Sequence, residues 1–164
     1  MSDADDDQLI ADVLAKSPEP YEEATDDELD AVEDKLDVVL PRLLRRLYLE
    51  VGDGGFGPGV GGMMQCSKLI QDPPGLVWIC DWGCAQWSCL DCRTADGPIV
   101  TVAGDYPPTE TEHTLRTWLR AWLDGVDLER EMFHPGPKRT VTNPFTKKPI
   151  ETEGQGKPRG RPWK

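Results

Sequence analysis

Residues 28–48 read ELDAVEDKLDVVLPRLLRRLY and contain two apolar stripes that are separated by one proline. The first stripe repeats at helical spacing and consists of Leu29, Val32, Leu36, Val39 and Leu40. Thr25 and Glu28 form a capping box in front of it. The second stripe follows Pro41 and consists of Leu43, Leu44, Leu47, Tyr48 and Val51. Because proline ends one helix but suits the first turn of the next, the sequence predicts a helical hairpin or a kinked helix pair.

An acidic segment precedes this helix pair. Residues 1–16 begin with acidic side chains and continue with apolar residues that favour a short amphipathic helix, namely Leu9, Ile10, Val13 and Leu14. The stretch SPEPYEEA, residues 17–24, is predicted to break that helix. We therefore treat residues 1–20 as an N-terminal acidic segment.

A glycine-rich stretch, GDGGFGPGVGG, follows at residues 52–62. It lacks the Gly-Lys-Ser/Thr of a phosphate-binding loop, so we interpret it as the end of a helix and an irregular turn. Three strands are then predicted at residues 76–80, 87–92 and 99–103, which are separated by turn residues and form a short antiparallel meander.

A final helix closes the globular part of the chain. Thr109 or Thr111 is predicted to cap it, and Gly125 lies near its expected end. Its apolar stripe consists of Leu115, Trp118, Leu119, Trp122 and Leu123. A stripe of tryptophan and leucine at this spacing is typical of a helix that packs on a core.

The charge divides sharply along the chain. The net charge is −12 overall, but residues 1–137 hold 28 acids and 10 bases, a net of −18, while residues 138–164 have a net of +6. The acidic excess serves either solubility or the binding of a basic partner. No apolar run is long enough to span a membrane, and the acidic start is unlike a signal peptide, so we expect a cytoplasmic protein without a membrane partner.

Four of the five cysteines fall in CDWGCAQWSCLDC, residues 80–92. Only Cys89 and Cys92 have the spacing of a zinc knuckle, and strand alternation would send them to opposite faces. We therefore interpret Cys80, Cys89 and Cys92 as packing residues and expect no metal and no other cofactor. A small zinc-binding protein is the alternative if the cysteines converge.

Catalytic patterns are weak. His113 is predicted on the solvent side of the closing helix and His134 in the tail, and neither lies near a serine or cysteine nucleophile in the sequence. The pair Asp26 and Asp27 is more typical of a helix N-terminus than of a catalytic dyad. We expect a protein that is not an enzyme.

The order of these elements resembles the SUKH (Smi/Knr-like) superfamily of small α+β domains. The residues that carry the resemblance are Leu40-Pro41, Gly54-Gly55, Trp82-Gly83 and Trp118 with Gly125. The resemblance implies an α+β fold over residues 21–133, with N-terminal helices, a short antiparallel sheet and a closing C-terminal helix. Residues 134–164 are expected to form a basic, Pro/Gly-rich flexible tail.

Many members of this superfamily are bacterial immunity proteins that bind and neutralise polymorphic toxins, and the resemblance implies this function here. A basic toxin domain is the expected partner, with a nuclease favoured because it must display a basic cleft. The expected partner-binding residues are Glu22, Glu23, Asp26, Asp27, Asp30, Gly54, Gly55 and Phe56.

The tail contains a second pattern. Residues 157–164, KPRGRPWK, resemble an AT-hook, in which Arg159, Gly160 and Arg161 would lie in the minor groove of A·T-rich DNA. The alternative function is therefore a DNA-tethered adaptor. A tail that only aids solubility is a third interpretation of the same residues.

Overall fold

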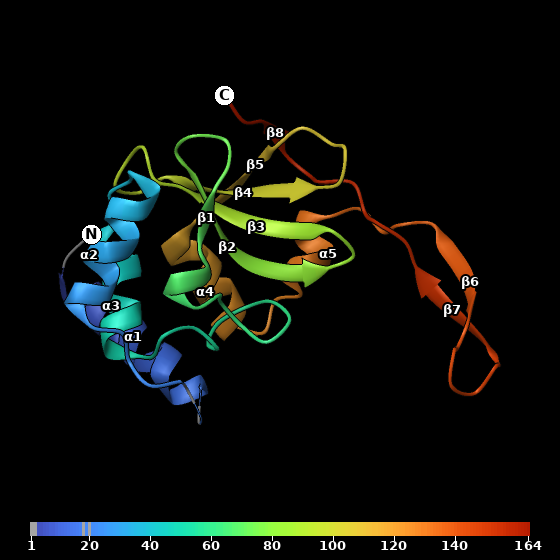
Figure 1. Ribbon diagram of the computed structural model, residues 1–164, viewed down its shortest axis with the longest axis horizontal. Helices are drawn as coiled ribbons and strands as arrows, with labels where there is room; N and C mark the ends of the chain where they lie inside the picture. The colour runs from blue at the N-terminus through green and yellow to red at the C-terminus, as the bar shows by residue number, and fades with distance from the viewer. Residues whose placement is uncertain (1–2, 18, 20) are drawn as a thin grey trace.

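A computed structural model describes residues 3–17, 19 and 21–164, and it has an α+β architecture (Figure 1). The helices of these residues are α1 (Asp3–Lys16), α2 (Asp26–Leu36), α3 (Arg42–Glu50), α4 (Leu115–Leu123) and α5 (Leu128–Met132), with a 3₁₀ helix η1 at Cys66–Lys68. The strands are β1 (Ile70–Gln71), β2 (Leu76–Gly83), β3 (Gln86–Asp91), β4 (Pro98–Ala103), β5 (Thr109–Thr114), β6 (Lys138–Thr142), β7 (Pro149–Glu153) and β8 (Arg161–Pro162). The α+β fold class predicted from the sequence is confirmed.

The main sheet has six antiparallel strands in the order β1-β2-β3-β4-β5-β8. Its central strands follow the predicted meander, since Trp78 lies opposite Cys89 and Cys89 lies opposite Val100. The strands β6 and β7 form a separate two-stranded hairpin that stands away from the rest of the molecule (Figure 1).

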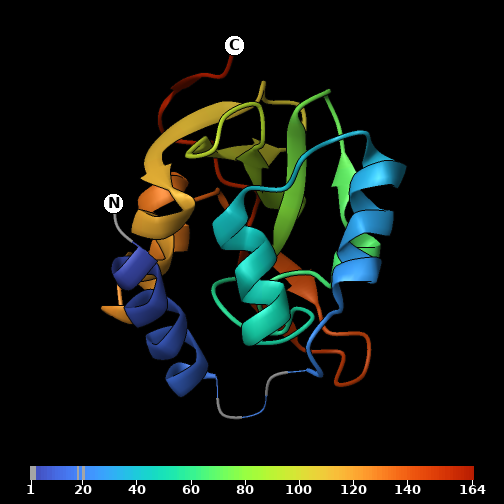
Figure 2. The ribbon, with the colours of Figure 1, turned by 90° about the vertical axis from the view of Figure 1, so that its left-hand side faces the viewer.

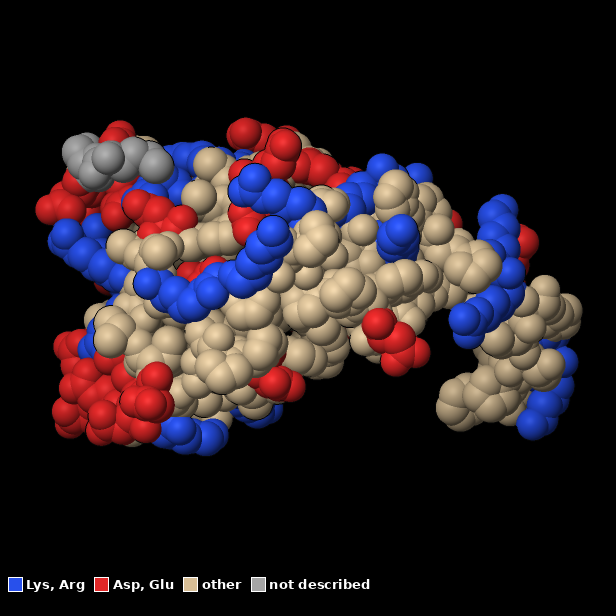
Figure 3. Space-filling model, turned by 90° about the horizontal axis from the view of Figure 1, so that it is seen from above, with Lys and Arg blue, Asp and Glu red and all other residues tan. Residues whose placement is uncertain are grey.

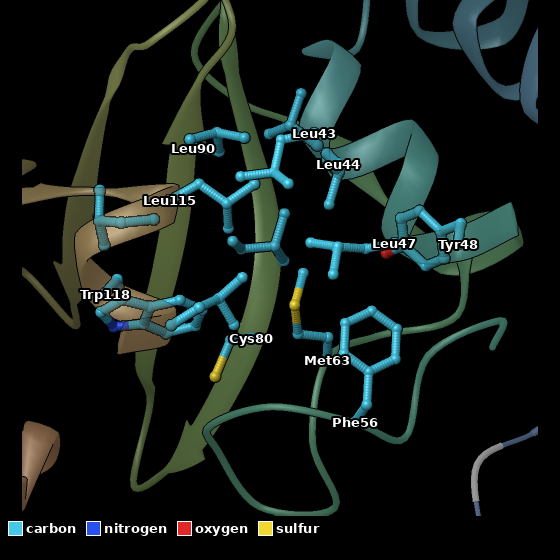
Figure 4. Packing of buried hydrophobic residues seen from close by; sticks show 14 of the residues in the cluster. Leu43, Leu44, Leu47, Tyr48, Phe56, Met63, Cys80, Leu90, Leu115 and Trp118 are labelled. Atoms are coloured by element: carbon cyan, nitrogen blue, oxygen red, sulfur yellow. The ribbon is translucent and has the colours of Figure 1, made fainter. Parts of the chain in front are cut away.

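The helices pack at one end and on one face of this sheet, with α3 between α1 and α2 (Figure 2). Leu44 and Leu47 of α3 meet Trp118 of α4 and the buried side chains of the sheet in one core (Figure 4). The N-terminal segment belongs to the same body, because α1 forms ion pairs with α4 between Asp12 and Arg120 and between Asp6 and Arg116.

The opposite face of the sheet carries a second, smaller apolar cluster. Leu76, Cys89 and Val100 are buried there, and Trp163 from the end of the chain packs against them. Trp163 Nε1 donates a hydrogen bond of 2.8 Å to Asp91, and the guanidinium of Arg93 lies over the Trp163 ring. Burial raises the pKa of Asp91, but hydrogen bonds from Arg93 and Trp163 outweigh burial and hold that pKa below its usual value.

The predicted helices are confirmed, with one change at an end. The capping box of Thr25 and Glu28 is present, and α3 begins after Pro41. Val39 was predicted in the apolar stripe of the first helix of the pair, but it lies beyond the end of α2 and is exposed. The first helix ends at Lys16, directly before the stretch 17–24 that is predicted to break it, and residues 18 and 20 of that stretch lie outside the described residues.

The predicted cap of the closing helix is wrong. Residues 109–114 form strand β5, and Thr114 caps α4 through a capping box with Thr117. The strand escaped prediction because it buries threonines rather than apolar residues. Thr111 Oγ1 donates to the carbonyl of Ile99 at 2.7 Å, so a polar side chain enters the sheet with its hydrogen bond satisfied.

The C-terminal segment also differs from its prediction. Residues 134–164 contain three strands where the sequence predicts no regular structure. Strand β8 is only two residues long, and its partner on β5 lies about fifty residues earlier in the chain. No local pattern identifies such a pairing, because its energy comes from backbone hydrogen bonds to a distant edge.

Candidate partner-binding surface

Residues 21–24, which directly precede α2, lie against the glycine-rich loop and the end of α3. The backbone N–H of Asp53 donates to the carbonyl of Glu22 at 2.9 Å, and the N–H of Ala24 donates to the carbonyl of Tyr48 at 3.0 Å. Gly55 lies directly under the ring of Tyr21, where a Cβ atom would come within 2.7 Å of that ring. Residues 21–24 and the glycine-rich loop therefore share one surface.

This surface contains a hollow of about 450 Å³, which we call the acidic hollow. It is lined by Tyr21, Glu22, Glu23, Thr25, Glu28, Asp53 and Gln65. Two of its four carboxylates already hold backbone groups, since Glu28 accepts from Thr25 N at 2.8 Å and Asp53 accepts from Cys66 N at 2.8 Å. Glu22 and Glu23 are exposed, and their carboxylates form no hydrogen bond or ion pair with the described residues, so they remain available to a partner.

Some acidic side chains of α2 pair with an arginine of α3, and others do not. Asp26 and Asp30 both accept hydrogen bonds of 3.0 Å from Arg45 of α3, which also pairs with Glu33. Burial lowers the pKa of Arg45, but its bonds to Asp26 and Asp30 outweigh burial and raise it. Asp27 is exposed and forms no ion pair with the described residues. The charge of Asp26 and Asp30 is thus partly neutralised within the molecule.

The residues of the glycine-rich loop lie beneath this surface and are mostly buried or half-buried. Phe56 is 2% exposed and packs edge-on against Tyr48, so its side chain belongs to the core and does not face a partner. Gly54 has a φ of +84° and is buried against the backbone of residues 63–65. Gly54 and Phe56 position the loop, and the exposed part of the surface comes from residues 21–27.

The chain was compared with known protein families. Residues 23–121, more than half of the chain, match the model of the SMI1 / KNR4 family (SUKH-1). The chain belongs to the SUKH-1 family. The match begins just before α2 and ends within α4, so it covers most of the acidic hollow and none of the residues after 121. Searches of curated proteins and of solved structures found no match.

Family membership is consistent with a protein-binding domain of the immunity type, and SUKH domains are generally not catalytic. The described residues contain no helix that is long and apolar enough to cross a membrane.

The cysteines of this SUKH-1 domain do not converge. Cys89 packs on the outer face of the sheet and Cys92 on the side of the main core, so the predicted divergence of the two is confirmed. A bulge after Trp78 turns Cys80 toward the main core as well. Burial raises the pKa values of Cys80 and Cys89 and raises that of Cys92 to about 12. Among the described residues, no three His, Cys, Asp or Glu side chains are placed to hold a metal ion.

One histidine lies in an arrangement that superficially resembles a catalytic triad. His113 Nε2 lies 2.6 Å from Glu131 Oε1, and its Nδ1 lies 3.3 Å from Thr117 Oγ1. The hydroxyl of Thr117 is committed to the cap of α4, where it accepts from Thr114 N at 2.9 Å and donates to the carbonyl of Thr114. His113 lies in β5, and its prediction on the closing helix is wrong. We assign these contacts to the packing of β5, α4 and α5.

The AT-hook-like residues are docked on the sheet. Arg161 pairs with Glu110 of β5, and Arg159 donates from its backbone N–H to the carbonyl of Met132 at 2.7 Å. Gly160 has a φ of +136° and approaches Glu110 so closely that a Cβ atom would lie 2.1 Å from its carbonyl oxygen. The glycine is therefore required by the contact with β5 in this fold.

Proposed function

We propose that this SUKH-1 domain is a bacterial immunity protein that binds and neutralises a polymorphic toxin, with a nuclease as the favoured class. The observation that carries the proposal is the acidic hollow, where Glu22 and Glu23 are exposed beside two carboxylates that hold the backbone. The rest of the body is also negatively charged, since residues 1–137 have a net charge of −18.

The chemistry of the hollow suits a basic side chain. A nuclease displays lysines and arginines where it binds phosphate, and an arginine can form two parallel hydrogen bonds with one carboxylate. Complementary charge raises the association rate more than it deepens the affinity. In this function the domain blocks the toxin by covering its basic cleft, and it carries out no chemical step.

The first experiment expresses the chain beside toxin domains that are encoded near it and measures survival. A double reversal, Glu22→Lys with Glu23→Lys, should lower the association rate about tenfold or more at low salt, because the steering field reverses locally. The matched control is Asp105→Lys with Asp124→Lys, which changes the net charge equally on exposed turns that do not line the hollow. The two double variants should converge at high salt, where exposed charges are screened.

Two outcomes contradict this proposal. Failure to protect against every neighbouring toxin removes the immunity function. Equal association rates for the hollow variant and its control remove the acidic hollow as the binding surface, even if protection is observed.

The DNA-tethered adaptor is the alternative function, and it needs Arg159 and Arg161 to leave their partners. Both arginines would exchange contacts with Phe133 and Glu110 for contacts with phosphate and the minor groove. Binding of A·T-rich DNA by these arginines can be tested independently of any toxin. The zinc-binding alternative loses its basis, since Cys89 and Cys92 lie on opposite faces of the sheet.

A further inference from the structure

The hairpin of β6 and β7, which we call the arm (residues 138–153), stands clear of the body (Figures 1 and 3). Every residue of its two strands is exposed. A two-stranded hairpin is at best marginally stable in water by itself. The arm is therefore a feature of the molecule that needs a partner or a special support.

Part of that support lies at the base of the arm. His134 N donates to the carbonyl of Lys157 at 2.7 Å, and Gly154 N donates to the carbonyl of Pro137 at 2.7 Å. Phe133 and Pro158 form a β-bridge just inside these bonds. The chain thus leaves and re-enters the body at one place, and β8 anchors the returning end. This construction holds the arm outward.

The tip of the arm is held by hydrogen bonds of its own. Asn143 Oδ1 accepts hydrogen bonds from the N–H groups of Phe145 at 2.8 Å and Thr146 at 3.1 Å, and Lys147 N donates to the carbonyl of Asn143. This turn presents Phe145 with 92% of its surface exposed. A large aromatic side chain on a preorganised turn is typical of an interface anchor, because little conformational freedom is lost on binding.

The register gives the arm two unlike faces. Val141 lies opposite Ile150, and alternation places this pair on the same face as Arg139 and Thr152. The other face carries both acids of the arm, Glu151 and Glu153. We define the arm face as Arg139, Val141, Ile150 and Thr152 together with the tip residues Phe145, Lys147 and Lys148. The arm face is apolar and basic, and Val141 and Ile150 are 44% and 40% exposed.

A surface of opposite character lies on the body of the same chain. A hollow of about 250 Å³ is lined by the half-buried Trp82 and Trp122 and by the exposed Val126, with Asp127 and Glu129 at its rim. We call it the receiving hollow. A cavity of roughly 150 Å³ is enough to hold benzene, so the receiving hollow has room for the ring of a phenylalanine.

Two carboxylates, Asp127 and Glu129, line the receiving hollow, and that of Asp127 pairs with Arg130 at 3.4 Å. Burial, together with the neighbouring carboxylates of Asp127 and Glu153, raises the pKa of Glu129. A lysine brought to this rim would relieve that repulsion. Lys147 and Lys148, which follow Phe145 closely in the chain, carry the complementary charge.

We propose that the arm docks on a second copy of this chain, with Phe145 in the receiving hollow of that copy and the two tip lysines at its acidic rim. The receiving hollow lies near the base of the arm, since Asp127 and Glu129 also line the cleft between the arm base and the body. Two copies related by a two-fold axis can therefore exchange arms reciprocally and form a closed dimer.

The charges favour a second copy over other occupants. A basic toxin would repel the arm face, and nucleic acid would meet a body with a net charge of −18. The body of another copy offers an acidic, partly apolar surface that both the tip and the basic residues of the arm face can use. The proposal does not depend on the proposed immunity function, because no toxin takes part.

The test is the oligomeric state of the full chain, measured by sedimentation equilibrium over a range of concentrations at low and high salt. We expect a concentration-dependent dimer that weakens as salt rises. Phe145→Ala should weaken it at least about tenfold, as loss of an anchor does. It should leave the unfolding midpoint of the monomer unchanged, because Phe145 is almost fully exposed. Thr140→Ala on the other face of the arm is the matched control and should leave dimerisation unchanged.

A mixing experiment tests the reciprocal geometry. Val126→Lys blocks the receiving hollow and repels the tip lysines, so it should impair dimerisation as Phe145→Ala does. A mixture of these two variants should associate better than either alone, because the mixed dimer keeps one intact joint. A monomer up to about 1 mM, a dimer that Phe145→Ala leaves unchanged, or failure of the mixture to recover association would each overturn the proposal. Capture of nucleic acid or of an unrelated protein by a monomeric chain would overturn it as well.

Discussion

Gly54 shows why a single residue controls the loop beneath the acidic hollow. Its φ of +84° is unfavourable for any residue with a Cβ atom. A Cβ atom there would lie 2.7 Å from the carbonyl oxygen of Met63 and 2.8 Å from the backbone nitrogen of Gln65. Backbone atoms cannot move aside as a flexible side chain can. The position therefore combines conformational strain with a steric clash.

Gly54→Ala should consequently lower the free energy of unfolding by more than the ~1–2 kcal/mol of left-handed strain alone. Gly61→Ala is the matched control, since Gly61 has a similar φ of +76° but no atom within 4 Å of the added Cβ. Urea unfolding of both variants measures the difference. Equal losses of stability in the two variants would show that the loop yields to the clash.

At the scale of elements, β8 and the residue after it form a clamp on the sheet. Trp163 covers the outer apolar cluster, its backbone N–H donates to the carbonyl of Pro108 at 3.0 Å, and its ring contacts Arg93. The two-residue strand itself contributes few hydrogen bonds. The tryptophan therefore provides most of the apolar contact that holds the C-terminal end in place.

Trp163→Ala should open this clamp while the main core stays folded. We expect the amide of residue 163 to exchange with solvent at least about tenfold faster. In the wild type, local opening exposes the apolar surface between Trp163 and the sheet to water, and this cost is largely absent in the alanine variant. Trypsin should also cleave faster after Arg159, whose N–H is bonded to Met132. Trp163→Phe retains an apolar ring, so its exchange and cleavage rates should lie between those of the wild type and those of Trp163→Ala. Unchanged exchange in the alanine variant would mean that backbone pairing alone holds the clamp.

At the scale of the whole molecule, acidic side chains gather at the helical end and basic side chains on the arm at the opposite end (Figure 3). The charge is distributed unevenly, with a net of −18 over residues 1–137 and of +6 over residues 138–164. The clamp brings the basic C-terminus back onto the acidic body through the pair of Arg161 and Glu110. Any binding of DNA by these arginines must compete with that contact.

This competition makes a prediction for DNA. The intact chain should bind A·T-rich duplex weakly, and Trp163→Ala should bind it more tightly because Arg159 and Arg161 are released. Binding to A·T-rich and G·C-rich duplexes is compared by fluorescence anisotropy at several salt concentrations, and the affinity should fall steeply with salt. Adding Arg161→Gln to the open variant should remove the preference for A·T. Equal affinity for both duplexes would reject the AT-hook and leave charge attraction only.

The sequence by itself determined α1 to α4 and the central strands, because their signals are local. A capping box at Thr25, a proline at position 41 and apolar repeats act over a few residues, and the capping box and the start of α3 after Pro41 appear in the structure where they are predicted. The order of those elements was also enough to indicate the SUKH family. The divergence of Cys89 and Cys92 followed from strand alternation alone.

Only the tertiary structure decided which of the acids remain available and what the C-terminus does. Asp26 and Asp30 are partly neutralised by Arg45, and Phe56 is buried, because helices and loops distant from each other in sequence pack together. The docking of Arg161 on Glu110 depends on a sheet edge about fifty residues earlier. Strand pairing at a sheet edge and ion pairs of this kind join segments whose sequences share no pattern. Such contacts can therefore be identified only in the folded chain.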